Sequence, residues 1–217
     1  MEYPLITGGT VFDAVILGNG GFPTAGVPLE ILRNASYLCC CDGAGVALIE
    51  DHGIMPQAIV GDGDSMPEDF KRRYAGIIHI VNEQEDNDQT KATRHCMDRG
   101  FRRLAYLGAT GRREDHTLGN VSLLVRYAVE LGLDVTMVTD YGCFVVTQGP
   151  CRLQTVPQQQ VSLFNVSCSE IAGEGFRWPT YAYRSFWQGT LNEAVGDSVT
   201  LRTDGCCVVY RTFGVKK

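Results

Sequence analysis

The sequence predicts an α/β fold in which an N-terminal Rossmann-like parallel sheet, with helices on both faces, precedes a C-terminal antiparallel β-sandwich domain. Two observations predict it. Up to about residue 141, short β-branched runs alternate with amphipathic helical stretches, which is the pattern of βαβ units. Beyond that point the apolar runs are short, turn residues separate them, and helical periodicity is absent. We therefore expect domains at residues 1–142 and 143–217.

The first domain should alternate strands with helices along its whole length. The expected strands cover residues 12–17, 37–41, 57–60, 77–81, 104–107 and 135–138. The expected helices cover residues 28–34, 44–52, 67–74, 87–99 and 114–131. Pro28 suits the first turn of its helix, and Gly53 and Gly100 suit the ends of theirs. Ligands of such sheets bind beyond the carboxyl ends of the strands, where the polar and glycine-rich clusters of this sequence fall.

The second domain should be built from short strands alone. We expect them at residues 144–147, 160–165, 184–188, 198–202 and 206–210. Asp204-Gly205 separates the last two runs and has the composition of a hairpin turn.

Composition excludes several classes of protein. The chain of 217 residues is 44% hydrophobic and 20% charged, as expected of a folded soluble protein. Its net charge of -6 argues against a nucleic-acid-binding surface. Nine cysteines without a zinc-type spacing suit reduced thiols in the cytoplasm. The N-terminus lacks a signal-peptide pattern, and no apolar run approaches the ~20 residues that span a bilayer.

The strongest polar cluster is Asp62-Gly63-Asp64, directly after the third expected strand. Gly63 lets the backbone bend so that both carboxylates can face one point. Mg²⁺ prefers oxygen ligands and is often held by one or two carboxylates together with substrate phosphates. A solvated turn rich in Asp and Gly would give the same letters, but the strand ahead of it favours a metal site.

Two further clusters follow later strands. Four acids occur within residues 83–88, and Lys91 lies one helical turn beyond Asp88 on the same face, although helix capping explains part of this pattern. Residues 108–116 combine a glycine-rich turn, a helix start and Arg112 and Arg113, which suits an anion. Asn19-Gly20-Gly21 and residues 42–45 also follow strands, although each could be a simple turn.

These clusters, in this order, resemble the motifs of the thiamine pyrophosphokinase family. The family shows, in order, Asn-Gly, DGGAN-like, GDxDS, DQDxTDxxK-like and GATGGRxDH motifs. The first three match Asn19-Gly20, Asp42-Gly43-Ala44 and residues 61–65 of this chain. The fourth matches Gln84, Asp88 and Lys91, and the fifth matches residues 108–111 with Arg113, Asp115, His116 and Asn120. Residues 175–179 and 189–193 are similar to segments of the family's β-sandwich. The departures include Arg112 for glycine and Leu191 for serine.

The resemblance implies transfer of diphosphate from ATP to thiamine, with Mg²⁺ as cofactor, by a cytoplasmic homodimer whose active site lies at the subunit interface. It assigns Mg²⁺ to Asp62, Asp64 and Asp88. It assigns ATP to Asn19, Asp42, Thr110, Lys91 and Arg113, and thiamine to Gln84, Asp115, Trp178 and Asn192. The residues expected to be catalytic are Asp64, Asp88, Lys91 and Arg113, and either Asp64 or Asp88 could accept the hydroxyl proton.

Two alternatives remain open from the sequence. A phosphatase of the haloacid dehalogenase type also carries a strand followed by D-x-D, but normally on an early strand. A non-catalytic thiamine or nucleotide sensor on the same fold is the other alternative, and Leu191 is the departure that motivates it.

Overall fold

The computed structural model describes residues 1–215 and divides them into two compact units. Residues 8–139 form an α/β unit, and residues 1–7 together with the chain from residue 140 onward form a β unit. The α/β class and the strand-rich second unit agree with the sequence prediction. No helix within residues 1–215 combines the length and apolar character needed to cross a bilayer.

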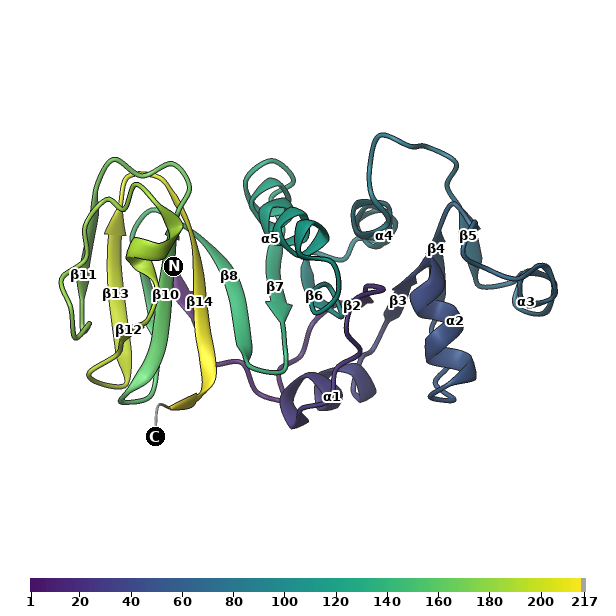
Figure 1. Ribbon diagram of the computed structural model, residues 1–217, viewed down its shortest axis with the longest axis horizontal. Helices are drawn as coiled ribbons and strands as arrows, with labels where there is room; N and C mark the ends of the chain where they lie inside the picture. The colour runs from purple at the N-terminus through teal and green to yellow at the C-terminus, as the bar shows by residue number, and fades with distance from the viewer. Residues whose placement is uncertain (216–217) are drawn as a thin grey trace. The chain divides into compact units, whose positions relative to one another are not determined.

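The α/β unit is built on a parallel sheet with the strand order β7-β6-β2-β3-β4-β5 (Figure 1). Three of its strands are buried along their whole length, which is typical of a sheet covered on both faces. The strands are β2 (Ala14–Leu17), β3 (Leu38–Cys41), β4 (Ala58–Gly61), β5 (Ile78–Ile80), β6 (Arg103–Leu107) and β7 (Asp134–Val138).

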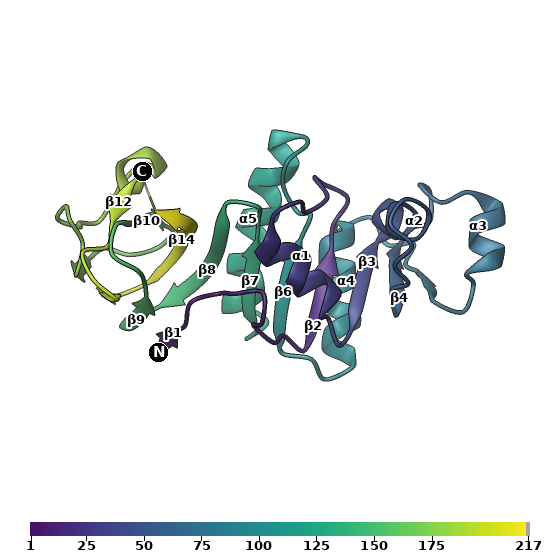
Figure 2. The same ribbon diagram turned by 90° about the horizontal axis from the view of Figure 1, so that it is seen from below.

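Helices connect successive strands of this sheet and lie on both of its faces. Figure 1 shows α4 and α5 on one face and α1 on the other, and in Figure 2, seen from below, α1 lies in front of the sheet. The helices are α1 (Gly26–Arg33), α2 (Asp42–Glu50), α3 (Glu68–Arg73), α4 (Asp88–Asp98) and α5 (Glu114–Val129). All five correspond to helices expected from the sequence, with ends that differ by one or two residues.

The strand order creates a switch point between β2 and β6. From β2 the chain proceeds outward through β3 and β4 to β5, and it then returns to pair β6 with β2 on the other side. The connections after β2 and after β6 therefore leave these neighbouring strands in opposite directions. A crevice forms at such a point, and ligands of open α/β sheets bind there.

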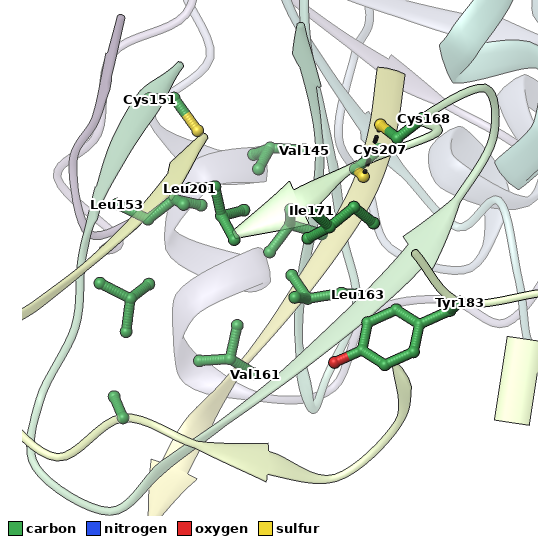
Figure 3. Close-up of a cluster of buried hydrophobic side chains, with 13 residues drawn as sticks. Val145, Cys151, Leu153, Val161, Leu163, Cys168, Ile171, Tyr183, Leu201 and Cys207 are labelled. Atoms are coloured by element: carbon green, nitrogen blue, oxygen red, sulfur yellow. Dashed lines mark hydrogen bonds between the residues drawn. The ribbon is translucent and has the colours of Figure 1, made fainter. Parts of the chain in front are cut away.

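The β unit is a sandwich of two sheets. One sheet has the order β12-β10-β14-β8 and the other the order β1-β9-β13-β11, with β1 parallel to β9. Apolar side chains from both sheets form one core, shown in Figure 3. The strands are β1 (Glu2–Tyr3), β8 (Gly142–Gln148), β9 (Cys151–Gln154), β10 (Gln159–Asn165), β11 (Ile171–Glu174), β12 (Asn192–Glu193), β13 (Ser198–Thr203) and β14 (Cys206–Val215).

Two local predictions in this unit were wrong. The expected strand at residues 184–188 is instead the 3₁₀ helix η1 (Phe186–Gly189), because Ser185 and Gln188 form a capping box that starts a helical turn. Asp204-Gly205 does not close a hairpin, because β13 and β14 belong to different sheets. The Asp204 carboxylate instead accepts hydrogen bonds from the backbone N–H groups of Ser169 and Glu170, 2.9 and 3.0 Å away.

Candidate active site

A pocket of about 370 Å³ lies at the switch point of the α/β unit. Its walls come from the turns after β2 and β6 and from the first turns of α4 and α5. Four of the residues to which the sequence assigned a catalytic or binding role line it, namely Asn19, Asp88, Thr110 and Arg113. The pocket thus collects polar residues that are far apart in the chain, because the carboxyl ends of parallel strands meet at one edge of the sheet.

Glycines allow the two turns to approach closely beside this pocket. The Gly20 N–H donates to the Gly108 carbonyl at 2.6 Å, and the Gly21 N–H donates to the Thr110 carbonyl at 2.6 Å. A Cβ at Gly20 would lie 2.4 Å from the Thr110 oxygen and 2.5 Å from the Gly108 oxygen. Gly108 has φ +60°, a left-handed conformation that suits glycine. A side chain at Gly20 would therefore clash with the backbone of the turn after β6.

Asp42 organises the acidic loop that follows β4. Its carboxylate accepts hydrogen bonds from the backbone N–H groups of Gly63 at 3.1 Å and Ser65 at 3.0 Å. Gly61 provides the space for this contact, since a Cβ there would lie 2.7 Å from the Cβ of Asp42. The two clusters that the sequence placed after different strands are therefore joined, and Asp42 fixes the conformation of the turn that carries Asp62 and Asp64.

Asp88 and Lys91 form the buried part of the site. The Lys91 ammonium lies 3.5 Å from an Asp88 carboxylate oxygen, and Lys91 is 4% exposed. Burial raises the pKa of Asp88, and the nearby carboxylates of Asp42 and Asp62 raise it further, while Lys91 opposes this shift. Three acids and one lysine thus share a small volume, in which a further cation would be stabilised.

The Asp62 carboxylate has a different environment from that of Asp88. Its Oδ1 accepts a hydrogen bond from the backbone N–H of Asp64 at 3.1 Å. This bond is the largest cause of the lowered pKa of Asp62, and hydrogen bonding to Gln84 and the charge of Lys91 lower the pKa further. Gln84 is therefore beside Asp62, at the acidic side of the site. The Asp64 side chain belongs to an exposed residue on the same turn.

Arginines stand on the other side of the pocket. Arg113 binds Asp115 through two hydrogen bonds of 3.1 and 2.6 Å, although both side chains are largely exposed. This contact lowers the pKa of Asp115 to about 2. Arg112 donates to the Asn19 side-chain oxygen at 3.3 Å and also lines the pocket. Arg113 is held by Asp115, whereas Arg112 links the turn after β6 to the turn after β2.

Amide side chains connect the helix starts around the pocket. Asn87 caps α4 by accepting from the Thr90 N–H at 3.0 Å, and its amide donates to the Asn120 side-chain oxygen at 3.1 Å. Asn120 donates in turn to the Ala109 carbonyl at 2.8 Å. Gln89, which the sequence reasoning missed, lines the pocket and donates to the Asn120 carbonyl at 3.4 Å. Its position in the first turn of α4 was the only available signal.

The remaining predicted residues, Trp178 and Asn192, lie in the β unit. The buried Asn192 side chain accepts from the Trp178 N–H at 3.2 Å and donates to the Trp178 carbonyl at 3.0 Å. Leu191 is 62% exposed and has φ +65°, which is unusual for a branched side chain. The structure thus brings Trp178 and Asn192 together, while Gln84 and Asp115 belong to the α/β unit.

Within residues 1–215 no group of three or more His, Cys, Asp or Glu side chains forms a ready-made metal site. The chemistry of the acidic side nevertheless fits Mg²⁺, because carboxylates crowd together around Asp88. Mg²⁺ is commonly held by one or two carboxylates, with substrate phosphates and waters as its other ligands.

The fold and pocket define a doubly wound α/β protein with its ligand pocket at the topological switch point. Comparison with known families is more specific. Residues 29–137 match the family described as "Thiamin pyrophosphokinase, catalytic domain", and residues 142–210 match "Thiamin pyrophosphokinase, substrate-binding domain". The first match alone covers half of the chain. This chain belongs to the thiamin pyrophosphokinase family, as the order of its motifs indicated.

Individual relatives agree with this assignment. A thiamin pyrophosphokinase of Caenorhabditis elegans is 27% identical over 106 residues, which is 45% of this chain and 43% of the relative. A thiamine pyrophosphokinase of Bacillus subtilis is 33% identical over 86 residues, 38% of this chain and 40% of the relative. The chain thus matches less than half the length of these curated relatives. Neither alternative raised by the sequence gains support from these matches.

Solved structures share the fold along nearly the whole chain. The thiamine pyrophosphokinase of Bacillus subtilis superposes with a TM-score of 0.75 at 20% identity, covering 93% of this chain and 99% of that one. The thiamin pyrophosphokinase of Candida albicans gives 0.79 at 15% identity, covering 98% and 93%. At these identities the superpositions establish the fold alone.

Proposed function

We propose that this chain is a thiamine pyrophosphokinase that transfers diphosphate from ATP to thiamine. The hydroxyl oxygen of thiamine attacks the β-phosphorus of ATP, and the bond from that phosphorus to the oxygen of the α-phosphate breaks. The products are thiamine diphosphate, AMP and the hydroxyl proton. One observation carries the proposal, which is that Asp88 and the glycine-rich basic turn after β6 line one switch-point pocket in the family's catalytic domain.

The basic side of the pocket suits the phosphates of ATP. Backbone N–H groups in the turn after β6 and the helix dipole at the start of α5 favour an anion. Arg113 and Thr110 line the pocket there, and Asn19 faces them from the turn after β2. We assign ATP binding to these residues, with Asp42 acting through the acidic loop that it holds.

The acidic side suits Mg²⁺, which Asp62, Asp64 and Asp88 would hold together with phosphate oxygens. When bound, the ion would withdraw charge from the phosphates and orient them for displacement. Lys91 is buried beside Asp88, and we assign it to neutralise phosphate charge that develops as the bond to AMP breaks. Asp64 and Asp88 remain the two candidates for the group that accepts the hydroxyl proton.

We assign thiamine to Gln84, Asp115, Trp178 and Asn192. Thiamine is an aromatic cation, so an indole face and carboxylates are suitable partners. The Arg177 guanidinium lies 5.2 Å from the centre of the Trp178 ring, and this cation–π contact supports the assignment of Trp178. Asn192 supports the role of Trp178 indirectly, because its two hydrogen bonds fix the Trp178 backbone.

We also propose a homodimer formed through the β unit. Between residues 178 and 195 this unit exposes large apolar side chains, and exposed apolar surface marks interaction sites. They are Trp178, Tyr181, Phe186, Trp187, Leu191 and Val195. Light scattering should give twice the chain mass for the wild type and a reduced mass for Trp187→Arg. A cytoplasmic location is part of the same proposal, since all nine cysteines are buried free thiols.

The direct test of the function is AMP formation from ATP and Mg²⁺, with and without thiamine, with the products identified by mass. We expect AMP only when thiamine is present, together with an equal amount of thiamine diphosphate. Release of free phosphate without an acceptor would contradict the proposal and favour a phosphatase. Thermal stabilisation by thiamine or ATP without any AMP would also contradict it and favour a binding protein.

A further inference from the structure

The loop between β5 and α4 carries Gln84 and leads directly into Asp88, and the Asp86 carboxylate anchors it. The Asp86 side chain is 11% exposed and contacts two arginines. Arg126 of α5 donates to its Oδ1 at 2.7 Å, and Arg94 of α4 pairs with its Oδ2. Asp86 thus ties the loop to two helices at once.

Residues on either side of Asp86 also hold this loop. The backbone N–H of Asp86 donates to the Glu83 carboxylate at 2.5 Å, and Glu83 pairs with Arg94 at 3.3 Å. On the other side, Asn87 binds Asn120 of α5 at 3.1 Å. Asp88 follows immediately as the first residue of α4. The backbone ahead of Asp88 is therefore fixed by side chains of α4 and α5.

Electrostatics explains why such anchoring is needed. Asp88 lies near Asp42 and Asp62, and these two carboxylates, together with burial, raise its pKa. Repulsion between these like charges pushes the loop away from the acidic turn after β4 unless cations oppose it. Lys91 neutralises Asp88 from inside the site, whereas Arg94 and Arg126 neutralise the acids on the outer side of the loop.

We propose that Asp86, Arg94 and Arg126 form a positioning clamp that presents Asp88 and Gln84 to Mg²⁺ and substrate. None of the three lines the pocket, so the clamp acts through the residues that it holds. This inference rests on the proposed function for its consequence in catalysis, but the ordering of the loop does not depend on that function. The clamp should matter most at low Mg²⁺, where the carboxylates are not yet neutralised by the ion.

The test compares Arg126→Met and Asp86→Asn with a matched control. Arg126 also pairs with the exposed Glu130 at 3.4 Å, so Glu130→Gln removes one ion pair of Arg126 and leaves the clamp intact. The first measurement is amide hydrogen exchange of residues 83–91 in the protein without ligands. We expect roughly ten-fold faster exchange in both clamp variants and no change in the control.

The second measurement is the Mg²⁺ concentration that gives half-maximal AMP formation. It should rise several-fold in both clamp variants, while kcat at saturating Mg²⁺ falls by less than about two-fold, because the ion restores the loop that the clamp no longer holds. Arg126→Lys should recover much of the wild-type Mg²⁺ dependence, since it keeps the charge.

Unchanged exchange and unchanged Mg²⁺ dependence in both variants would overturn the clamp. Faster exchange throughout the α/β unit in Asp86→Asn, which keeps the shape of the side chain, would also overturn it in favour of a general structural role. If the wild type forms no AMP, the proposed function fails. The exchange measurement still decides whether the clamp orders residues 83–91.

Discussion

The two units of this protein use buried charge in different ways. In the α/β unit, the buried Lys91 shares a pocket edge with Asp88 and nearby carboxylates, and these acids repel one another. In the β unit, the buried cation is Arg211, which is 1% exposed and donates to the backbone carbonyls of Tyr3, Pro4 and Gln154 at 3.2, 2.9 and 2.6 Å. We assign the Lys91 charge to a ligand, whereas the Arg211 charge is hydrogen-bonded to the chain itself.

Substitutions in the two units should therefore differ in whether they mainly affect activity or stability. In the α/β unit, carboxylates from several strand ends crowd around Asp88, so replacing the proposed site residues should affect activity more than stability. In the β unit, polar residues complete hydrogen bonds within the fold, and apolar residues from both sheets fill one core (Figure 3). Replacing these should affect stability more than activity.

The largest expected effect is that of Asp64→Ala. We expect turnover to fall on the order of 10³-fold or more, because a proposed ligand of the Mg²⁺ that would stabilise charge in the transition state is removed. The melting temperature should stay unchanged, since Asp64 belongs to an exposed turn. The counterpart in the β unit is Asp204→Ala, which should lower the melting temperature and leave turnover unchanged. Substantial activity of Asp64→Ala would contradict the metal assignment.

A second prediction concerns the turn pair at the switch point. Gly20→Ala should destabilise the protein by about 1–3 kcal/mol, because its Cβ would meet two backbone oxygens that cannot move aside independently. Activity should fall with it, since the turn borders the pocket. Gly26→Ala is the matched control, because nothing lies within 4 Å of its Cβ. Denaturant unfolding and AMP formation measure both effects, and equal behaviour of the two variants would contradict the close approach.

A third prediction uses the histidines, all four of which belong to the α/β unit. Burial, followed by the charge of Arg99, lowers the pKa of His95 to about 4, whereas an unfolded histidine titrates near ~6.5. The unfolded chain therefore binds the proton first, and stability should be lost as pH falls from about 6.5 to about 4. The Tyr37 hydroxyl lies 2.9 Å from His95 Nε2, so the glutamine of His95→Gln can keep a hydrogen bond to that hydroxyl.

The expected result is a loss of several degrees in melting temperature over this range for the wild type, and a smaller loss for His95→Gln. Hydrogen exchange should place the difference between the two proteins in the α/β unit. A difference located in the β unit, which has no histidine, would contradict the prediction.

The smallest expected effect is that of Leu191→Gly. Leu191 has φ +65°, and its side chain is largely exposed within a single chain, so the substitution relieves backbone strain and gives up little burial within that chain. Because glycine also makes the unfolded chain more flexible, the net gain should be about 0.5–1 kcal/mol in unfolding free energy. A loss of stability would mean that the Leu191 side chain makes an important contact.

The elements of the α/β unit could be predicted from sequence because each is specified locally. A few residues are enough to recognise a buried strand, such as the one ending at Cys41, or a helix start, such as Asn87. Much of the pocket followed from them, since residues just after parallel strands must meet at one edge. Gln89 was missed because a glutamine inside a helical turn carries no such signal. The roles assigned to the site residues remain predictions.

The β unit was less predictable, and the reason is physical. Two of its strands, β1 and β12, are only two residues long, and so short a segment shows no periodicity. Asp204-Gly205 has hairpin composition, yet the flanking strands pair in different sheets. The local sequence specifies a turn, but the partner of each strand depends on packing across the sandwich.

The sequence by itself determined the family, the alternation of strands and helices, and the placement of polar clusters at strand ends, because these depend on local pattern and order. Tertiary structure decided which distant groups meet. It placed the Asp42 carboxylate on the turn at residues 63–65, joined Asp86 to Arg126, and paired β1 with β9, which lies much later in the chain. Such contacts close long loops, and only the packing of the folded chain offsets that loss of entropy.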